Sequence, residues 1–192
     1  MTSEISSALV EIEAALERLG RRVLLDALRV GIDADRVRAL LAACGLTSVR
    51  DVEALYAWHD GTETTGVASV DDIHLFPGFY LLSLEDAVAN YRAFVEDPRW
   101  AQGWLPLFAN GGGDFYVVEL SGGGQGAVRH FRIEEVEHPI EFSSLADMID
   151  TLAVGFDRRV FFVDSGGYLE MDDLAFAALA AELNPGVSWW SE

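Results

Sequence analysis

The sequence of 192 residues contains no lysine, one cysteine and no run of 18 apolar residues. The single cysteine, Cys44, excludes an internal disulfide and a multi-cysteine zinc site, and we expect it to be a small buried residue. The N-terminus carries glutamates where a secretory signal would need basic residues and then an apolar stretch. The sequence therefore predicts a soluble cytoplasmic protein that does not bind membranes.

Basic residues are scarce, since 13 arginines stand against 32 acidic residues and the net charge is -19. Residues 1–50 hold seven arginines and seven acids, so the whole excess lies in residues 51–192, with six arginines and 25 acids. Such a surface repels polyanions, which argues against direct nucleic-acid binding, and it steers basic partners toward the protein. Solubility alone would also account for this charge, because surface charge by itself identifies no ligand.

Aromatic residues are absent before Tyr56, and all 21 of them fall at or after it. Residues 1–47 show helical periodicity instead, and we expect them to form an N-terminal helical extension to a main domain at 48–192. Its first helix has one apolar face, made of Ile5, Leu9, Ile12, Leu16 and Leu19. A second helical stretch covers 21–30, and Asp33 is expected to cap a third that ends near Cys44. These faces must pack on the following domain or on a second copy of the chain, and homo-oligomerisation through them is one expectation.

The sequence pattern changes at Ser48. Ser48 and Asp51 resemble a capping box at the start of a helix, and Gly61 is expected to end that helix. A polar loop follows at 62–72, then an extended stretch at 73–82, and Ser83 with Asp86 predicts the start of a helix that continues to Phe94.

Three strands are expected at 104–109, 114–120 and 127–133, and glycine-rich turns between them predict an antiparallel meander. A helix started by Ser143 or Ser144, a hairpin turning at 164–167 and a last helix stopped by Asn184, Pro185 and Gly186 complete the chain. The fold class is therefore α+β, with an antiparallel sheet packed by helices.

The stretch YAWHDGT at 56–62 sets His59 beside Asp60, which suggests a general base and its carboxylate. Neighbouring residues on a helix point about 100° apart, so the two side chains would not bond each other. We expect them to form the last helical turn, where a histidine satisfies free carbonyls. Catalysis by His59 with a carboxylate and a metal is the weaker alternative.

Two glycine-rich segments invite comparison with phosphate-binding loops. The stretch at 110–114, NGGGD, lacks the lysine and the serine or threonine of a P-loop, and no helix follows it, so we expect a tight turn between strands. The stretch at 121–126, SGGGQG, is expected to be a mobile hairpin loop.

The four histidines, His59, His74, His130 and His138, show no short metal-ligand spacing. Three acid pairs match no EF-hand loop and are expected to be solvated; they are Asp71/Asp72, Glu134/Glu135 and Asp172/Asp173. No metal or cofactor is therefore expected. Each of the five tryptophans is expected in the core, although some would line a groove; they are Trp58, Trp100, Trp104, Trp189 and Trp190.

The order of these motifs resembles the SUKH superfamily over about residues 48–190. The resemblance is carried by LYAWHDGT, LFPGFYLLSLEDAVANY, GWLPLFANGGGDFYVVEL, SSLADMIDTLA and the terminal FFVDSGGYLEMDD...NPGVSWW. Matching positions of the shared pattern are Trp58, Gly61, Phe76, Pro77, Leu84, Trp104, Pro106, Gly113, Asp114, Asn184, Pro185 and Gly186. Most of these residue types suit turns and packing. Asp60 stands where the family often has asparagine.

The resemblance implies an α+β fold, no established catalytic residues and protein binding as the activity. It is shared by bacterial immunity proteins that neutralise toxins and by fungal regulators of cell-wall synthesis. We expect an immunity protein that binds a basic toxin domain, such as a nuclease, and the alternative is a regulatory scaffold protein. The acids expected to form the contact surface are Asp60, Glu63, Asp71, Asp72 and Asp114.

Overall fold

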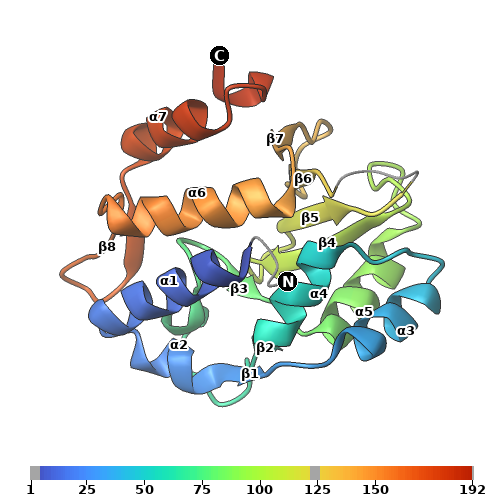
Figure 1. The fold of residues 1–192 in the computed structure, drawn as a ribbon, viewed down its shortest axis with the longest axis horizontal. Coiled ribbons are helices and arrows are strands. Elements are labelled where there is room, and N and C mark those ends of the chain that lie inside the picture. Colours follow the sequence, from blue (N-terminus) through green and yellow to red (C-terminus); the bar gives the residue numbers. More distant parts are fainter. Residues whose placement is uncertain (1–4, 122–125, 192) are drawn as a thin grey trace.

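A computed structural model describes residues 5–121 and 126–191 (Figure 1). The chain begins with helices α1 (Ile5–Arg18), α2 (Arg22–Ala27), α3 (Ala34–Ala42) and α4 (Arg50–Trp58). A two-stranded antiparallel sheet joins β1 (Leu28–Val30), which follows α2, to β2 (His59–Thr62), which follows α4. The expected second helix is therefore wrong in its last three residues, because β2 lies beside them and pairs with them.

The main sheet has five antiparallel strands in the order β3-β4-β5-β6-β7. The strands are β3 (Tyr80–Leu81), β4 (Trp104–Ala109), β5 (Phe115–Glu119), β6 (Val128–Phe131) and β7 (Ile140–Phe142). The expected meander is confirmed, with register partners such as Phe115 and Phe131. The edge strand β7 was not predicted, since it is only three residues long.

The other elements are η1 (Val70–Ile73), α5 (Leu84–Phe94), α6 (Leu145–Asp157), the hairpin β8 (Phe161–Val163) and β9 (Leu169–Met171), α7 (Asp173–Leu183) and η2 (Ser188–Ser191). Side-chain caps begin α5 and α6 as predicted: the Oγ atoms of Ser83 and Ser144 accept hydrogen bonds from the N–H groups of Asp86 and Asp147. The α+β class is confirmed.

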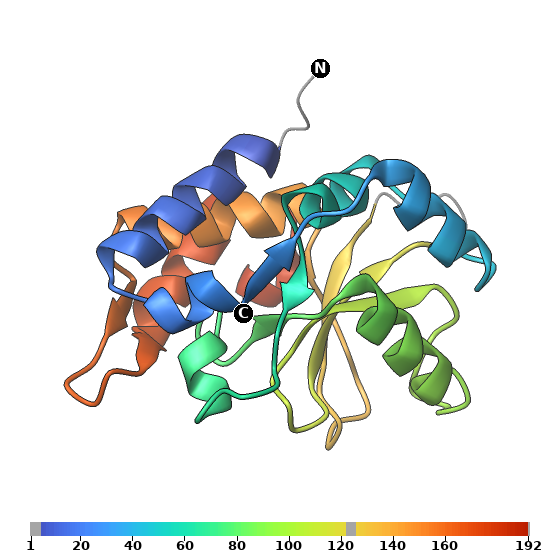
Figure 2. The same ribbon diagram turned by 90° about the horizontal axis from the view of Figure 1, so that it is seen from below.

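Helix α5 covers one face of the main sheet, where Phe94 contacts the rings of Phe115 and Phe131 (Figure 2). Because side chains alternate along a strand, Tyr116 and His130 project from the opposite face. Helix α6 crosses the molecule between α1 and α7 (Figure 1). Tyr116 and His130 therefore face the part of the molecule that α6 and α7 build.

The apolar face of α1 packs on α6 and α4 of the same chain, which settles where this face is buried. Its residues belong to the same buried cluster as those of the main sheet. Helix α3 begins as expected, since the Asp33 carboxylate accepts a hydrogen bond from the N–H of Arg36 at 2.8 Å.

Within the described ranges, no helix combines the length and the apolar composition needed to cross a membrane.

Candidate functional site

A cleft of about 250 Å³ lies between the main sheet, α6 and the C-terminal segment. The sheet contributes the face that carries Tyr116 and His130, and the C-terminal segment contributes α7 and η2. The apolar lining includes Phe76, Phe79, Phe142, Met148, Phe176 and Trp190, and the polar lining includes Tyr116, His130, Arg132 and Glu141. An apolar pocket into which a few polar groups converge is the usual form of a binding site.

A buried carboxylate, Glu141, stands at the polar end of the cleft with its side chain 2% exposed. The Tyr116 hydroxyl donates to its Oε2 at 3.1 Å, and Arg132 Nη2 donates to its Oε1 at 3.0 Å. His130 Nδ1 lies 3.6 Å from the same Oε1. A buried charge is tolerated when it is paired in this way. Loss of the Tyr116 or the Arg132 donor would leave the buried Glu141 carboxylate without enough hydrogen bonds. The three side chains therefore hold one another in place in the wall of the cleft.

Tyr116 acts here as a hydrogen-bond donor. Burial, and then the neighbouring Glu141 carboxylate, raise the pKa of Tyr116 well above its ordinary value of 10. The hydroxyl therefore stays protonated at neutral pH and serves as a donor to the Glu141 carboxylate.

The C-terminal tryptophans close the cleft from the other side. The Trp190 ring contacts Phe142 at a tilt and Phe176 edge-to-face, and its indole N–H donates to the backbone carbonyl of Glu141 in the edge strand β7. Trp189 is 39% exposed and lies with its ring under the guanidinium of Arg132. Of the other tryptophans, Trp100 and Trp104 are buried, and Trp58 is half-buried and donates to Glu13.

Residues 59–62 do not form the last turn of a helix, so that prediction is wrong. Helix α4 ends at Trp58, and His59 begins strand β2, where its Nδ1 bonds the Arg29 carbonyl of β1 at 2.8 Å. Gly61 has φ +81°, and a Cβ there would lie 2.2 Å from the backbone nitrogen of Ser83. Glycine at 61 is thus required by the close approach of β2 to the start of α5.

The start of α4 also differs from expectation. Val49 occupies the N-cap position without a side-chain cap, and the Ser48 hydroxyl donates to the Val49 carbonyl instead. The predicted capping box of Ser48 and Asp51 is wrong, because the helix begins one residue later than that motif requires.

Two of the five acids expected at the contact surface hold backbone groups of other segments. Asp60 Oδ1 accepts a hydrogen bond from the N–H of Leu84 at 2.9 Å, at the start of α5. Asp114 Oδ1 accepts from the N–H of Ile133 at 2.9 Å, and its Oδ2 accepts from the side-chain amide of Asn110. Both carboxylates are therefore partly enclosed by their own chain.

The other three acids lie around β2 and η1. Glu63 pairs with Arg29 at 3.0 Å and accepts from the N–H and hydroxyl of Thr65, which lower its pKa to about 2. Asp71 accepts from the hydroxyl of Ser69, and Asp72 lies beside it in η1. The Gly111 Cβ position lies 3.9 Å from a methyl group of Val70, so the turn that leads to Asp114 approaches η1.

The remaining positions of the family pattern have structural roles. Leu84, Phe76 and Trp104 are buried, and Pro77 turns the chain between Phe76 and Phe79. Pro106 lies where the register of β4 and β5 shifts, a position that tolerates a residue without an N–H.

The residues of the family pattern that lie in turns and at the end of α7 also have structural roles. A Cβ on Gly113 would lie 2.8 Å from Ile133. The buried Asn184 amide donates to the Thr151 hydroxyl and to the Ala180 carbonyl, both at 3.0 Å, and so ends α7. Pro185 and Gly186 follow it at the surface.

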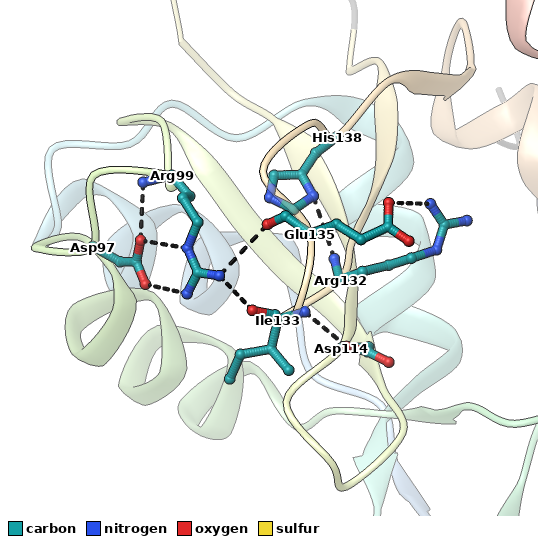
Figure 3. A network of polar contacts seen from close by, with 7 residues as sticks. All are labelled: Asp97, Arg99, Asp114, Arg132, Ile133, Glu135 and His138. Carbon is teal, nitrogen blue, oxygen red and sulfur yellow. Dashed lines mark hydrogen bonds and ion pairs between the residues drawn. The ribbon is translucent and has the colours of Figure 1, made fainter.

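Residues 132–139 form a loop between β6 and β7 that several long-range contacts fix (Figure 3). We call it the β6–β7 loop. The strand expected at 127–133 therefore ends earlier than predicted, at Phe131. Arg99 donates to the carbonyl oxygens of Ile133 and Glu135, and Asp97 holds its guanidinium through two hydrogen bonds at 3.0 and 2.8 Å. His138 Nδ1 accepts from the N–H of Arg132 at 3.3 Å. The partners are up to 36 residues apart in the sequence, so no local motif signals them.

Residues 5–121 and 126–191 contain no group of three or more His, Cys, Asp or Glu side chains that would hold a metal ion. Asp172 caps α7, with its carboxylate accepting from the N–H of Ala175. The NGGGD stretch is a turn between β4 and β5, as predicted, in which Asn110 Oδ1 accepts from the N–H groups of Gly112 and Asp114. Most of the expected loop at 121–126 lies outside the described residues.

Comparison with known families gives one match. The model of the SMI1/KNR4 family (SUKH-1) matches residues 33–151, well over half of the chain. The match runs from the N-cap of α3 into α6, and it includes the main sheet and the cleft residues Tyr116, His130, Arg132 and Glu141. A comparison with curated proteins found no match.

Proposed function

Because the chain belongs to the SMI1/KNR4 (SUKH-1) family, we propose that it is a non-enzymatic protein-binding domain of bacterial immunity type. In this proposal it acts in the cytoplasm and neutralises a basic toxin domain, such as a nuclease, by direct stoichiometric binding. No nucleic acid or membrane takes part in the contact. The cleft and the acidic surface serve recognition rather than chemistry.

The observation that carries the proposal is the charge of residues 51–192, where 25 acids stand against six arginines. Four of these arginines are engaged in ion pairs within the fold, namely Arg99 with Asp97, Arg129 with Glu119, Arg132 with Glu141 and Arg158 with Glu182. Each of these pairs also neutralises one acid, so residues 51–192 keep an excess of 19 negative charges. The outer surface of this region is left strongly negative, which favours a basic partner.

A negative field of this kind acts mainly on the rate of encounter. Opposite charges accelerate association, and the acceleration weakens as salt screens them. Affinity then depends on a few central contacts, usually aromatic or aliphatic anchors.

The five acids expected from the sequence remain proposed contributors to this field. Glu63 is ionised over the whole physiological range, because hydrogen bonds from Thr65 hold its pKa near 2. Asp60 and Asp114 act at longer range in this proposal, since their carboxylates already accept hydrogen bonds from backbone N–H groups.

The test is neutralisation in cells. The reading frame beside this gene is expressed in a bacterial host under a controlled promoter, with and without this protein. We expect growth arrest by the neighbouring product alone, rescue by co-expression, and a 1:1 complex on size exclusion. Rescue without a complex, or a complex without rescue, would contradict neutralisation by direct binding.

The second candidate function is a regulatory scaffold of the cell-wall regulator type. The half-open cleft with Trp189 at its rim favours it, since partly exposed aromatics suit the binding of several partners. Affinity purification of the tagged protein from its own cells separates the two. A scaffold would bring down several unrelated proteins, and an immunity protein would bring down one basic partner.

A further inference from the structure

The β6–β7 loop exposes apolar side chains where solvation alone would favour polar ones. Val136, at its centre, is 80% exposed, and Ile133 in the loop and Ile140, the first residue of β7, are also exposed. Trp189 of η2 lies beside the loop and is a further exposed apolar residue. Exposed apolar side chains that gather in one place mark an interaction surface more often than isolated ones do.

A groove of about 500 Å³ separates the loop from η2. It is lined by Glu135, Glu137, His138, Pro139, Ser188 and Trp189. An indole and a proline ring thus lie beside two carboxylates. A long cationic side chain suits such a groove, because its aliphatic stem can pack on the rings while its charged end meets the carboxylates.

The charged residues that the loop exposes are all acidic, and η2 carries no charged residue within Ser188–Ser191. Glu134, Glu135 and Glu137 are exposed on the loop. The three arginines that contact the loop are occupied: Arg99 by Asp97 and the loop carbonyls, Arg129 by the His138 carbonyl and Glu119, and Arg132 by Glu141 and at 3.8 Å by Glu135. His138 accepts at Nδ1 from a backbone N–H, so its ring is neutral in this arrangement.

The loop is also held in one conformation before any partner arrives (Figure 3). Arg99 fixes two of its carbonyl groups, Asp114 fixes the N–H of Ile133, and His138 fixes the N–H of Arg132. A preorganised surface loses little conformational entropy on binding, which raises affinity. These contacts explain how a surface loop can present Val136 in a fixed position.

We propose that the β6–β7 loop and Trp189 together form the docking surface for a basic protein segment. Val136 and Trp189 are its apolar anchors, and Glu134, Glu135 and Glu137 pair with arginine or lysine side chains of the partner. The identity of that partner as a toxin domain rests on the proposed function; the location and chemistry of the surface do not.

The first test needs no natural partner. The protein labelled with ¹⁵N is titrated with a short synthetic peptide of alternating arginine and leucine, and amide and indole shifts are followed by NMR. We expect the largest shifts at residues 133–138 and at the Trp189 indole, and their loss in Val136→Ser. Leu174→Ser is the matched control, because Leu174 is 85% exposed on α7. Shifts centred on Glu63, Asp71 and Asp72, or no binding, would overturn the proposal.

The second test uses the product of the neighbouring reading frame. The variant Glu134→Gln/Glu135→Gln/Glu137→Gln is expected to lower the association rate at low salt by about tenfold. A control that removes the same three charges elsewhere, Glu11→Gln/Asp157→Asn/Glu170→Gln, is expected to lower it by less than about threefold. Equal effects, or a larger effect of Asp72→Asn, would place the contact elsewhere. Peptide binding at the loop without any complex with the neighbouring product would contradict the proposed function and leave the docking surface standing.

Discussion

The carboxylate of Asp60 in β2 accepts a hydrogen bond at 2.9 Å from the backbone N–H of Leu84, the first residue of α5. Ser83 already caps the N–H of Asp86 in the same turn. Two free N–H groups at this helix end are therefore satisfied by side chains, one of them from a distant strand.

The first prediction concerns this second cap. Asp60→Ala should lower the free energy of unfolding by about 1 kcal/mol, because the Leu84 N–H loses its acceptor and the negative charge leaves the helix start. Asp60→Asn keeps an acceptor oxygen and should cost less. Urea denaturation of the two variants and the parent protein measures the difference. A stability of Asp60→Ala equal to that of the parent would show that the cap is not used.

Gly61 gives a sharper test of the same junction. Gly61→Ala should cost at least about 2 kcal/mol, because the residue has φ +81° and the new methyl group would overlap the backbone of Ser83. Gly20→Ala is the matched control, since φ is +74° and no atom lies within 4 Å of the added carbon. It should cost only about 1 kcal/mol from the backbone conformation. Equal losses in thermal denaturation would contradict the close approach of β2 to α5.

The expected boundary between residues 47 and 48 is tested by substitutions in α1. Leu9 is 1% exposed and packs in the same buried cluster as the main sheet, so Leu9→Ala should cost about 2–5 kcal/mol. The neighbouring Val10 is exposed, and Val10→Ala should change stability by less than about 0.5 kcal/mol.

Calorimetry of these α1 variants reports on cooperativity as well. We expect a single transition that Leu9→Ala shifts as a whole. Two transitions, with only the smaller one shifted, would show that residues 1–47 unfold apart from the rest.

The burial of two histidines predicts how the free energy of unfolding depends on pH. Burial lowers the pKa of His74 and of His138 below 6.5, and at His138 the charge of Arg99 adds to this effect. Both histidines bind protons more readily in the unfolded chain than in the folded protein. Their contribution to the free energy of unfolding is therefore complete above about pH 6.5. It is lost as the pH falls toward the lower pKa values that the two rings have in the folded protein.

Proton NMR titration of the histidine rings, together with urea denaturation at pH 7.5, 6.5 and 5.5, checks this prediction. We expect the rings of His74 and His138 to titrate below 6.5 and the free energy of unfolding to decline over this interval. Titration of either ring above 6.5 would contradict the burial that the structure shows.

Local sequence signals predicted most of the elements and few of the contacts between them. Asp33 and Ser83 were identified as caps, and Ser144 was one of two candidates with Ser143, because a capping residue and its helix are adjacent in sequence. The strands β4, β5 and β6 were found from their alternation and the glycines between them.

The errors occurred where a distant segment decides the conformation. The sequence predicted a helix end at His59 and Gly61. In the structure both residues belong to a strand, because β1 and the start of α5 lie beside them. The sequence did not predict the roles of Glu141 and Arg99. These roles depend on hydrogen bonds with residues 9 to 36 positions away in the sequence. The alternation of Ile140, Glu141 and Phe142 was the one local hint of β7, and three residues are too short a pattern to predict a strand.

The measurement that tests the proposed function most directly is the association rate of this protein with the product of the neighbouring reading frame, followed by stopped-flow fluorescence of the tryptophans at increasing salt. An acidic protein that steers a basic partner should show a rate that falls by about tenfold or more between low and high salt, with a 1:1 stoichiometry. A rate independent of salt, or no association at any salt concentration, would contradict the proposal.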